Sequence, residues 1–263
     1  MNTYEDILFE TKDDVGILTL NRPERLNAMG GKLVPSALAL IEKLSEDRSV
    51  RALIITGAGR GFCSGADLNP EAPLEDSAGH LGDGMRNGIN KLILAITNAP
   101  FPVVSAVNGA AAGAGVGIAL AADFLIASES MRLLLTFSRI GMGMDAGTSW
   151  FLAHALGTKR AAAIGMLIEP ITADKAVEWG IAYSATSDEK LMDEAMELAT
   201  RLSQGATLAY AAQKKQFRLA LDSTLEEALD DEASVQDILI RSNDLKEGVA
   251  AFREGRPGNY TGS

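Results

Sequence analysis

The sequence is poor in the residues that form disulfides and metal sites. Its 263 residues include one cysteine, Cys63, and two histidines, His80 and His154. One cysteine excludes an internal disulfide framework and a thiolate zinc site, and two histidines disfavour a histidine-rich metal site. A chain of this length can bury a full apolar core without such staples. We therefore predict a fold with no metal site.

Positive charge is scarce too. Lys and Arg number 24 against 35 Asp and Glu, which is a formal net charge of −11. Because binding to phosphates requires clustered Lys and Arg, we expect neither nucleic acid nor an anionic membrane as a partner. The hydrophobic content of 47% and the charged content of 22% exclude a disordered chain and fit a folded enzyme.

No targeting signal and no uninterrupted apolar span is recognisable. The first ten residues, MNTYEDILFE, are acidic and lack a basic segment followed by an apolar one. Residues 92–122 carry no charge and are long enough to cross a bilayer, but Pro100, Pro102 and Asn108 interrupt them. The second half of this stretch is mostly Gly and Ala, which insert poorly. We expect these residues to be buried in pieces within a cytoplasmic protein.

Strand and helix patterns alternate up to about residue 186. Alternation and short apolar runs predict strands at 7–11, 15–20, 52–56, 102–107, 124–127 and 181–185. Helical spacing predicts helices at 31–47, 92–96, 109–122, 148–156 and 172–180, with a loop-rich segment over 57–90. From Ser187 onward only helices are predicted, one of them opened by a capping box over 223–226. We therefore expect an α/β core over residues 1–200 and a C-terminal helical subdomain over residues 201–263.

A glycine-rich segment, 57–68, follows the predicted strand at 52–56. Such a strand exit exposes backbone N–H groups, which suits an anion or a developing oxyanion. No Gly-Lys-Ser/Thr follows at P-loop spacing, and no helix with clear periodicity begins there, so neither nucleotide fingerprint fits. A plain turn is the alternative.

A second segment, 108–117, opens the predicted Gly/Ala helix. Its small side chains let a ligand approach the backbone, where the positive end of the helix dipole lies. Tight packing of this helix against the sheet explains the same composition equally well.

The third segment, 142–147, places Asp145 between apolar neighbours at a junction between loop and helix. This carboxylate either caps the helix or points into a pocket. No Ser-His-Asp set can be assembled, because His154 lies in an apolar helix and His80 has no local partner. Cys63 is interpreted as a buried apolar filler.

Taken in order, these segments resemble the crotonase superfamily of enoyl-CoA hydratases and isomerases. The likeness covers nearly the whole chain. It is carried by Asn21-Arg-Pro-Glu-Arg-Leu-Asn-Ala-Met29, Arg51-Ala-Leu-Ile-Ile-Thr-Gly57, Gly61-Phe-Cys-Ser-Gly-Ala-Asp-Leu68, residues 102–123, Glu247-Gly-Val-Ala-Ala-Phe252 and Arg256-Pro257. Each motif alone is weak, but their order is specific.

The resemblance implies a ββα spiral core and an acyl-CoA thioester substrate, with no cofactor beyond the coenzyme A of that substrate. It implies an oxyanion hole formed by the backbone N–H groups of Ser64 and Ala114, the second strengthened by a helix dipole. Arg256 would reach the CoA of a neighbouring subunit. The other residues that the resemblance assigns to CoA or substrate are Arg25, Leu26, Ala28, Gly65, Ala66, Asp67, Leu68, Gly113, Phe137 and Met144.

Two departures from the family pattern shift the expected reaction. Gly117 and Phe137 stand where hydratases of the family carry the two glutamates that position water and move its proton. Asp145 remains, at a place where some isomerases and a dehalogenase of the family carry a working carboxylate. One carboxylate can take a proton from one carbon and return it to another, whereas hydration works best with a separate acid and base. Desolvation by Phe137, Met142 and Met144 would raise the pKa of Asp145.

We therefore expect double-bond isomerisation of an enoyl-CoA, with Asp145 as acid and base. The alternatives are a hydratase, a hydrolase or dehalogenase that uses Asp145, and a catalytically silent acyl-CoA-binding homologue. Aromatic candidates for a pocket around an aryl ring are Phe62, Phe137 and Trp150. The resemblance also implies a homotrimer or a hexamer of paired trimers, with the C-terminal helices at the interfaces. The apolar positions that support such an interface are Leu219, Leu225, Ala228, Leu229 and Ile238.

Overall fold

A computed structural model describes residues 4–68 and 79–263 of the chain. Its main sheet has six strands in the order β1-β2-β3-β5-β7-β10, of which β1 and β2 are antiparallel and the remaining pairs parallel. The strands are β1 (Ile7–Lys12), β2 (Val15–Leu20), β3 (Ala52–Gly57), β5 (Val103–Val107), β7 (Phe124–Ser128) and β10 (Ser184–Thr186). Every residue of β3 and β5 is buried, which is why both read as continuous apolar runs.

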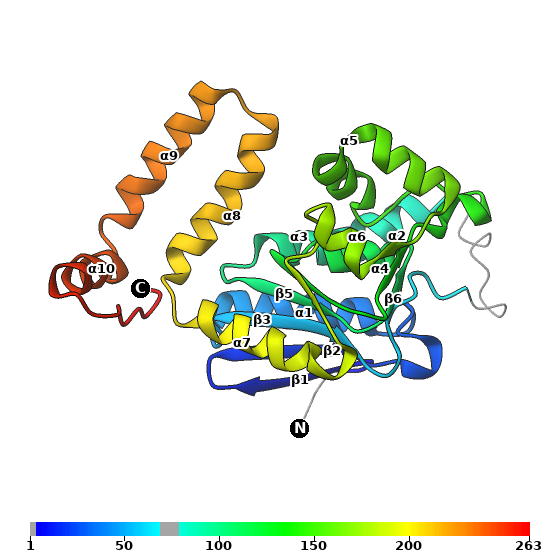
Figure 1. Cartoon of the computed structure of the whole chain (residues 1–263), viewed down its shortest axis with the longest axis horizontal. Helices are drawn as coiled ribbons and strands as arrows, with labels where there is room; N and C mark the ends of the chain where they lie inside the picture. The colour runs from blue at the N-terminus through cyan, green and yellow to red at the C-terminus, as the bar shows by residue number, and fades with distance from the viewer. Residues whose placement is uncertain (1–3, 69–78) are drawn as a thin grey trace.

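The two faces of the main sheet are covered by different helices. Side chains alternate along β3, so that Leu53 and Ile55 pack in one apolar cluster and Ile54 in the other. The first cluster includes α1 (Leu33–Asp47) and α3 (Ile89–Asn98), and the second includes α7 (Leu191–Ser203). Figure 1 shows α7 lying along the sheet. The sheet is therefore buried on both sides.

A second, smaller sheet positions the loops of interest. It contains β4 (Gly61–Cys63), β6 (Ala110–Ala112), β8 (Arg132–Leu134) and β9 (Ile171–Thr172), in that order. β4 and β6 follow β3 and β5 of the main sheet after short connections, and they pair in parallel. Since parallel neighbours end at the same edge, the segments that leave β4 and β6 emerge side by side.

The remaining core helices are short or bent. They are α2 (Leu81–Asn87), α4 (Ala114–Leu120), α5 (Thr148–Leu167) and α6 (Ala173–Glu178), with 3₁₀ turns at Pro23–Arg25, Thr136–Ile140 and Asp188–Lys190. α5 bends at Gly157, whose φ of 72° and ψ of 157° are not helical.

The C-terminal part is helical, with α8 (Thr207–Asp222), α9 (Leu225–Leu239) and α10 (Asn243–Glu254). Figure 1 shows α8 and α9 as an antiparallel pair that extends away from the sheet, with α10 beyond them. The predicted architecture, a mixed α/β core followed by helices, is confirmed. The boundary at residue 200 stays a prediction, and α7, which packs on the sheet, runs past it to Ser203.

Several element predictions were wrong in detail. The segment predicted as a loop over 57–90 contains β4 and α2, and the part of it over 69–78 lies outside the described residues. α2 buries no side chain, so it leaves no apolar periodicity in the sequence. The predicted helix at 109–122 is divided into β6 and α4, because Gly113, at a φ of 51°, ends the strand before the helix starts.

Three further boundaries differ. The helix predicted to end at residue 156 continues past Gly157 to Leu167 as α5. The predicted strand at 181–185 is β10, Ser184–Thr186. The capping box lies one residue later than predicted, since Thr224 accepts the N–H of Glu227 and the Glu227 carboxylate accepts the N–H of Thr224.

Candidate active site

The loop after β4 touches the start of α4 through a glycine. A Cβ placed on Gly65, whose φ is +87°, would lie 2.7 Å from the carbonyl oxygen of Ala112 and 3.3 Å from the amide nitrogen of Ala114. Only a residue without a side chain allows this approach. The backbone at 64–66 and the N-terminus of α4 are thereby held against each other.

Of the two amide donors predicted at this junction, Ser64 and Ala114, one is already bonded within the protein. The N–H of Ser64 donates to the carbonyl oxygen of Leu26 at 3.0 Å, so it is already used. Within the described residues, the N–H groups of Ala66 and Ala114 have no hydrogen-bond acceptor, and both residues line one cavity. The prediction for Ser64 is corrected by this bond, and Ala66 takes its place beside Ala114 as a candidate donor.

Asp145 lies between the 3₁₀ turn Thr136–Ile140 and the start of α5. Its backbone carbonyl oxygen accepts the N–H of Thr148 at 2.9 Å and the hydroxyl of Thr148 at 2.8 Å. Its side chain makes no cap, because α5 has Gly147 as its N-cap residue and no side-chain cap bond. The alternative in which this carboxylate merely closes its own helix is therefore excluded.

Asp145 instead lines the same cavity as Ala66 and Ala114. Its Oδ1 atom is buried and has no hydrogen-bond partner within the described part of the chain. Desolvation by burial raises the pKa of Asp145 to about 6, and no positive charge opposes this effect. An unpaired carboxylate with a pKa near neutrality suits a general acid or base.

The cavity has a volume of about 350 Å³ and is mainly apolar. Asp145 is the one charged residue in its lining, as far as the described residues show. Apolar side chains reach it from α2, α3 and the turn before Asp145, among them Met85, Ile89 and Met142. The predicted site residues that line it are Ser64, Ala66, Leu68, Gly113, Ala114, Phe137 and Asp145. The cavity thus suits an uncharged and largely apolar part of a ligand, and it contains two amide donors and one carboxylate that such a ligand could meet.

Other predicted site residues do not line the cavity but hold together the two segments beside it. Asp67 pairs with Arg22, at 2.8 Å between Oδ2 and an Arg22 terminal nitrogen, and Arg22 also donates to the carbonyl of Ala28 at 2.7 Å. Ala28 itself is buried, and Leu26 is partly buried against Gly61. These residues tie the turn after β2 to the loop after β4.

Three more predicted residues are not part of the cavity. The side chain of Arg25 is exposed. Met144 packs against Gly165 of α5, and Met142 lines the cavity in its place. Arg256 binds Glu247 at 2.5 Å and Glu254 at 2.6 Å near the end of α10. Within one chain, Arg256 is therefore engaged away from the cavity.

Asn27 has a structural role that the sequence alone did not indicate. Its side chain is fully buried, donates to the carbonyls of Ala58 and Gly61 at 2.9 and 2.8 Å, and accepts the N–H of Arg22 at 2.9 Å. Its φ of 56° is in the left-handed region, which Asn tolerates better than most residues. In the sequence, the feature that could have indicated this role is an Asn within a turn that contains Pro and charged residues.

At the two positions where hydratases of the family carry glutamates, this chain has Gly117 and Phe137. Phe137 is buried and lines the cavity. Gly117 lies in α4, and a Cβ on it would collide with the carbonyl oxygen of Ala146. Neither position offers a second acid or base, so Asp145 is the one acidic residue among the described residues that line the cavity.

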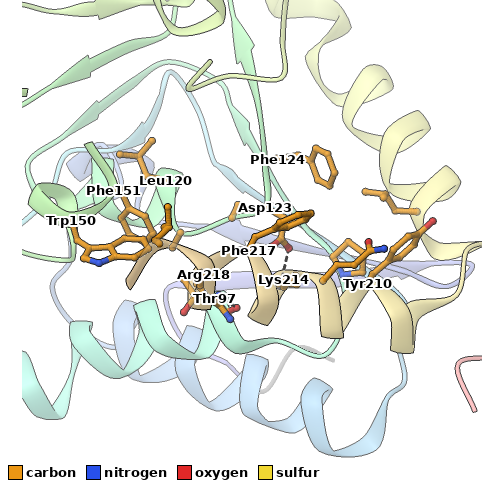
Figure 2. Close-up of a pocket in the computed structure, with 16 residues that line it drawn as sticks. Thr97, Leu120, Asp123, Phe124, Trp150, Phe151, Tyr210, Lys214, Phe217 and Arg218 are labelled. Atoms are coloured by element: carbon orange, nitrogen blue, oxygen red, sulfur yellow. Dashed lines mark hydrogen bonds and ion pairs between the residues drawn. The ribbon is translucent and has the colours of Figure 1, made fainter. Parts of the chain in front are cut away.

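A second cavity, of about 510 Å³, lies between α8 and the core (Figure 2). Its charged groups already have partners, because Lys214 binds Asp123 at 2.8 Å and Arg218 donates to the carbonyl of Thr97. Trp150 lines this cavity, and Phe62 is buried in the core. Of the three aromatic candidates, Phe137 alone lines the cavity of Asp145.

Over residues 4–68 and 79–263, no group of three or more His, Cys, Asp or Glu side chains is placed to hold a metal ion. None of the helices in that same part of the chain combines the length and apolarity needed to cross a bilayer.

Comparisons with known proteins agree with one another. The family model described as enoyl-CoA hydratase/isomerase matches residues 10–263. The 1,2-epoxyphenylacetyl-CoA isomerase of Escherichia coli (strain K12) is 37% identical, over 98% of this chain and 99% of its own. The trans-2-decenoyl-acyl-carrier-protein isomerase of Streptococcus mutans serotype c is 35% identical, over 98% and 99%. A crystal structure of an enoyl-CoA hydratase from Polaromonas sp. JS666 superimposes with a TM-score of 0.92 at 30% identity, covering 97% of this chain and 99% of that one.

Proposed function

The chain is an enzyme of the enoyl-CoA hydratase/isomerase family with the crotonase fold, and we propose that it isomerises the double bond of an enoyl thioester. The observation that carries this proposal is the unpaired carboxylate of Asp145, the one charged group that the described residues contribute to an apolar cavity, which also contains the free amide donors of Ala66 and Ala114. One carboxylate suffices for moving a proton between two carbons of the same substrate.

In the proposed reaction, Asp145 removes a proton from C2 of a 3-enoyl thioester and returns it at C4. Loss of the proton leaves a dienolate, whose negative charge rests on the thioester oxygen. The pKa of about 6 lets Asp145 be ionised in the resting enzyme and still act as an acid once it has taken the proton.

The N–H groups of Ala66 and Ala114 hold the thioester oxygen in this proposal. Ala114 is the first residue of α4, so the positive end of the helix dipole adds to its hydrogen bond, although α4 is short. Loss of one such donor typically costs about 3–4 kcal/mol of transition-state stabilisation. Gly65 and Gly113 allow the two amides to converge.

Hydration is less well supported, because Gly117 and Phe137 supply no second acid or base. Direct attack of Asp145 on an aryl ring is also less well supported, since Phe137 is the one aromatic side chain in the described lining of the cavity. The printed names of two relatives favour isomerisation, one of an acyl-CoA and the other of an acyl-carrier-protein ester.

The remaining assignments complete the proposal. The CoA portion would lie along the segment of Arg25, Leu26 and Ala28 and the segment 65–68, with no cofactor besides the substrate's own coenzyme A. The protein would be cytoplasmic and would assemble as a homotrimer or as a hexamer of paired trimers. In that assembly, Arg256 would approach the CoA bound by a neighbouring subunit.

The decisive experiment follows proton movement in deuterated water. Purified protein is mixed with a 3-enoyl-CoA, a 2-enoyl-CoA and the matching acyl-carrier-protein esters, and the products are identified by mass spectrometry and NMR. We expect the 3-enoyl ester to become the 2-enoyl ester, with deuterium at C4 to the extent that the proton held by Asp145 exchanges with solvent before it is returned. Asp145→Asn should lower this rate at least 1000-fold, because general acid–base catalysis supplies about 10²–10⁴-fold and both proton transfers are lost.

The control is Asp174→Asn, an equal charge change at an exposed position of α6, which should leave the rate unchanged. Equal isomerisation by wild type and Asp145→Asn would disprove the role of Asp145. Conversion to a 3-hydroxyacyl ester instead would assign a hydratase, and thioester cleavage a hydrolase. Binding of these esters without turnover would identify a silent homologue.

A further inference from the structure

The backbone next to Asp145 rests directly on α4. A Cβ placed on Gly117 would collide with the carbonyl oxygen of Ala146 and would lie 2.6 Å from the Ala146 Cβ. Real Cβ atoms do not approach other heavy atoms so closely. The backbone after Asp145 can therefore occupy its position only because residue 117 has no side chain.

Ala146 is also in an unusual conformation. Its φ of 49° lies in the left-handed region, which is uncommon for residues other than Gly, Asn and Asp, and its side chain is buried. Gly147 follows with a φ of 74°. Two successive left-handed residues reverse the chain between Asp145 and α5. Such a conformation persists where surrounding packing holds it, and the surface of α4 at Gly117 supplies that packing.

The position of the carboxylate depends on this reversal. The Asp145 carbonyl oxygen is directed to Thr148 at the start of α5, while its side chain lines the cavity that contains Ala66 and Ala114. A shift of the Ala146 backbone away from α4 would move Asp145 with it, since the two residues are adjacent. Displacement by about 1 Å is enough to cost roughly 100-fold in rate.

We propose that Gly117 is a positioning residue for Asp145: by admitting the left-handed Ala146 backbone onto α4, it sets where the Asp145 carboxylate stands in the cavity. This inference rests on the proposed function for its catalytic consequence, but the position of the carboxylate can be tested independently. A side chain at position 117 and the present position of the Ala146 backbone would occupy the same space. The chain can therefore have one or the other, but not both.

The test compares Gly117→Ala with a matched control. Gly248→Ala places the same methyl group on a helical glycine of α10, where the nearest atom would be 3.4 Å away, so it should behave as wild type. Gly117→Ala should reduce kcat for isomerisation about 100-fold with a much smaller change in KM. The double variant Gly117→Ala/Ala146→Gly removes the facing methyl group and frees the left-handed residue, and it should recover part of the loss, about tenfold.

A readout without substrate separates the two proposals. The Asp145 carboxyl carbon is observed by NMR after ¹³C-aspartate labelling, with its signal assigned by its absence in Asp145→Asn, and is titrated with pH. We expect a midpoint near pH 6 in wild type and in Gly248→Ala, and a midpoint at least one pH unit lower in Gly117→Ala, because a displaced carboxylate regains water. Where Gly117→Ala does not fold, the double variant is titrated and assayed by the same criteria.

Two results would overturn the inference. One is a folded Gly117→Ala or double variant with the kcat of wild type. The other is an unchanged Asp145 titration in that variant, even if its activity falls, because the loss would then have a general structural cause. By contrast, full isomerisation by Asp145→Asn together with a shifted titration in Gly117→Ala would refute the proposed function and leave the positioning role standing.

Discussion

At the scale of single residues, the main feature is that Asp145 is kept without a partner. A buried, unpaired carboxylate destabilises a protein when it is ionised, and the surrounding side chains supply neither a cation nor a hydrogen-bond donor to Oδ1 within the described residues. By contrast, Asp67 and Asp123 each have a cationic partner. The contrast is typical of a group that is retained for its chemistry at a cost in stability.

The stability of Asp145→Asn should depend on pH in a defined direction. Because the pKa of Asp145 is raised from 3.8 to about 6, folding favours its protonated form. The destabilisation by this group is therefore absent below about pH 4 and fully developed above about pH 6. Asp145→Asn should match wild type at pH 4 and exceed it at pH 7.5 by on the order of 1 kcal/mol, less than the whole shift because the carboxyl is partly exposed.

Denaturant unfolding at both pH values measures this effect, with Asp174→Asn as the control of equal charge. A variant that is more stable than wild type by the same amount at pH 4 and at pH 7.5 would contradict the raised pKa. The catalytic counterpart is a kcat/KM that declines below about pH 6 as the base becomes protonated.

At the scale of elements, α8 contacts the core mainly through the ion pair and hydrogen bonds of two basic side chains, Lys214 and Arg218. Lys214 binds Asp123, as Figure 2 shows, and donates to two backbone carbonyls. Arg218 donates to the carbonyl of Thr97 and to the Asn98 side chain. The Lys214 side chain is 9% exposed although it carries a charge. Since α8 buries a single residue, Thr207, polar contacts to the ends of α3 and β7 orient it more than apolar packing does.

Lys214→Ala should therefore destabilise the protein strongly. Removing one partner of a buried ion pair typically costs about 3–5 kcal/mol, because the remaining charge, here that of Asp123, loses its ion-pair partner. Lys215→Ala changes the same residue type at the next, exposed position and should stay within about 0.5 kcal/mol of wild type. Thermal or denaturant unfolding compares the two variants. Equal stability of both would mean that the ion pair does not hold α8.

At the scale of the whole molecule, the C-terminal helices leave many apolar side chains uncovered. α9 buries no residue, and the side chains of Leu225, Ile238 and Phe252 are 76%, 70% and 88% exposed. Large apolar side chains that are exposed in this number on neighbouring helices are typical of a surface that associates with another protein. It supports the proposed assembly of identical chains, in which these helices would lie at the interfaces.

Phe252→Glu should weaken that assembly without unfolding the chain, because the side chain that it replaces is almost fully exposed in one subunit. Lys246→Gln changes the net charge by the same amount at another exposed position of α10 and serves as the control. Sedimentation velocity over a dilution series should show a trimer or hexamer for wild type and the control, and smaller species for Phe252→Glu. A monomeric wild type would refute the proposed assembly.

The order of motifs and the local periodicities by themselves determine much of this protein's secondary structure and its family resemblance. The strands of the main sheet, the amphipathic helix α1 and the change to helices alone after residue 186 follow from side-chain spacing, which records burial along a single element. The family resemblance and the role expected of Asp145 follow from the identity and order of residues. Elements without buried side chains, such as α2, left no such record.

Contacts between distant segments were decided by the tertiary structure alone. That the Ser64 amide is used by Leu26, leaving Ala66 beside Ala114, depends on how the turn after β2 meets the loop after β4. That the Asp145 side chain enters a cavity and does not cap its helix depends on Ala146 resting on Gly117. The physical reason is that these arrangements arise from hydrogen bonds and steric limits between segments far apart in sequence. A residue's neighbours along the chain carry no information about which distant backbone will meet it.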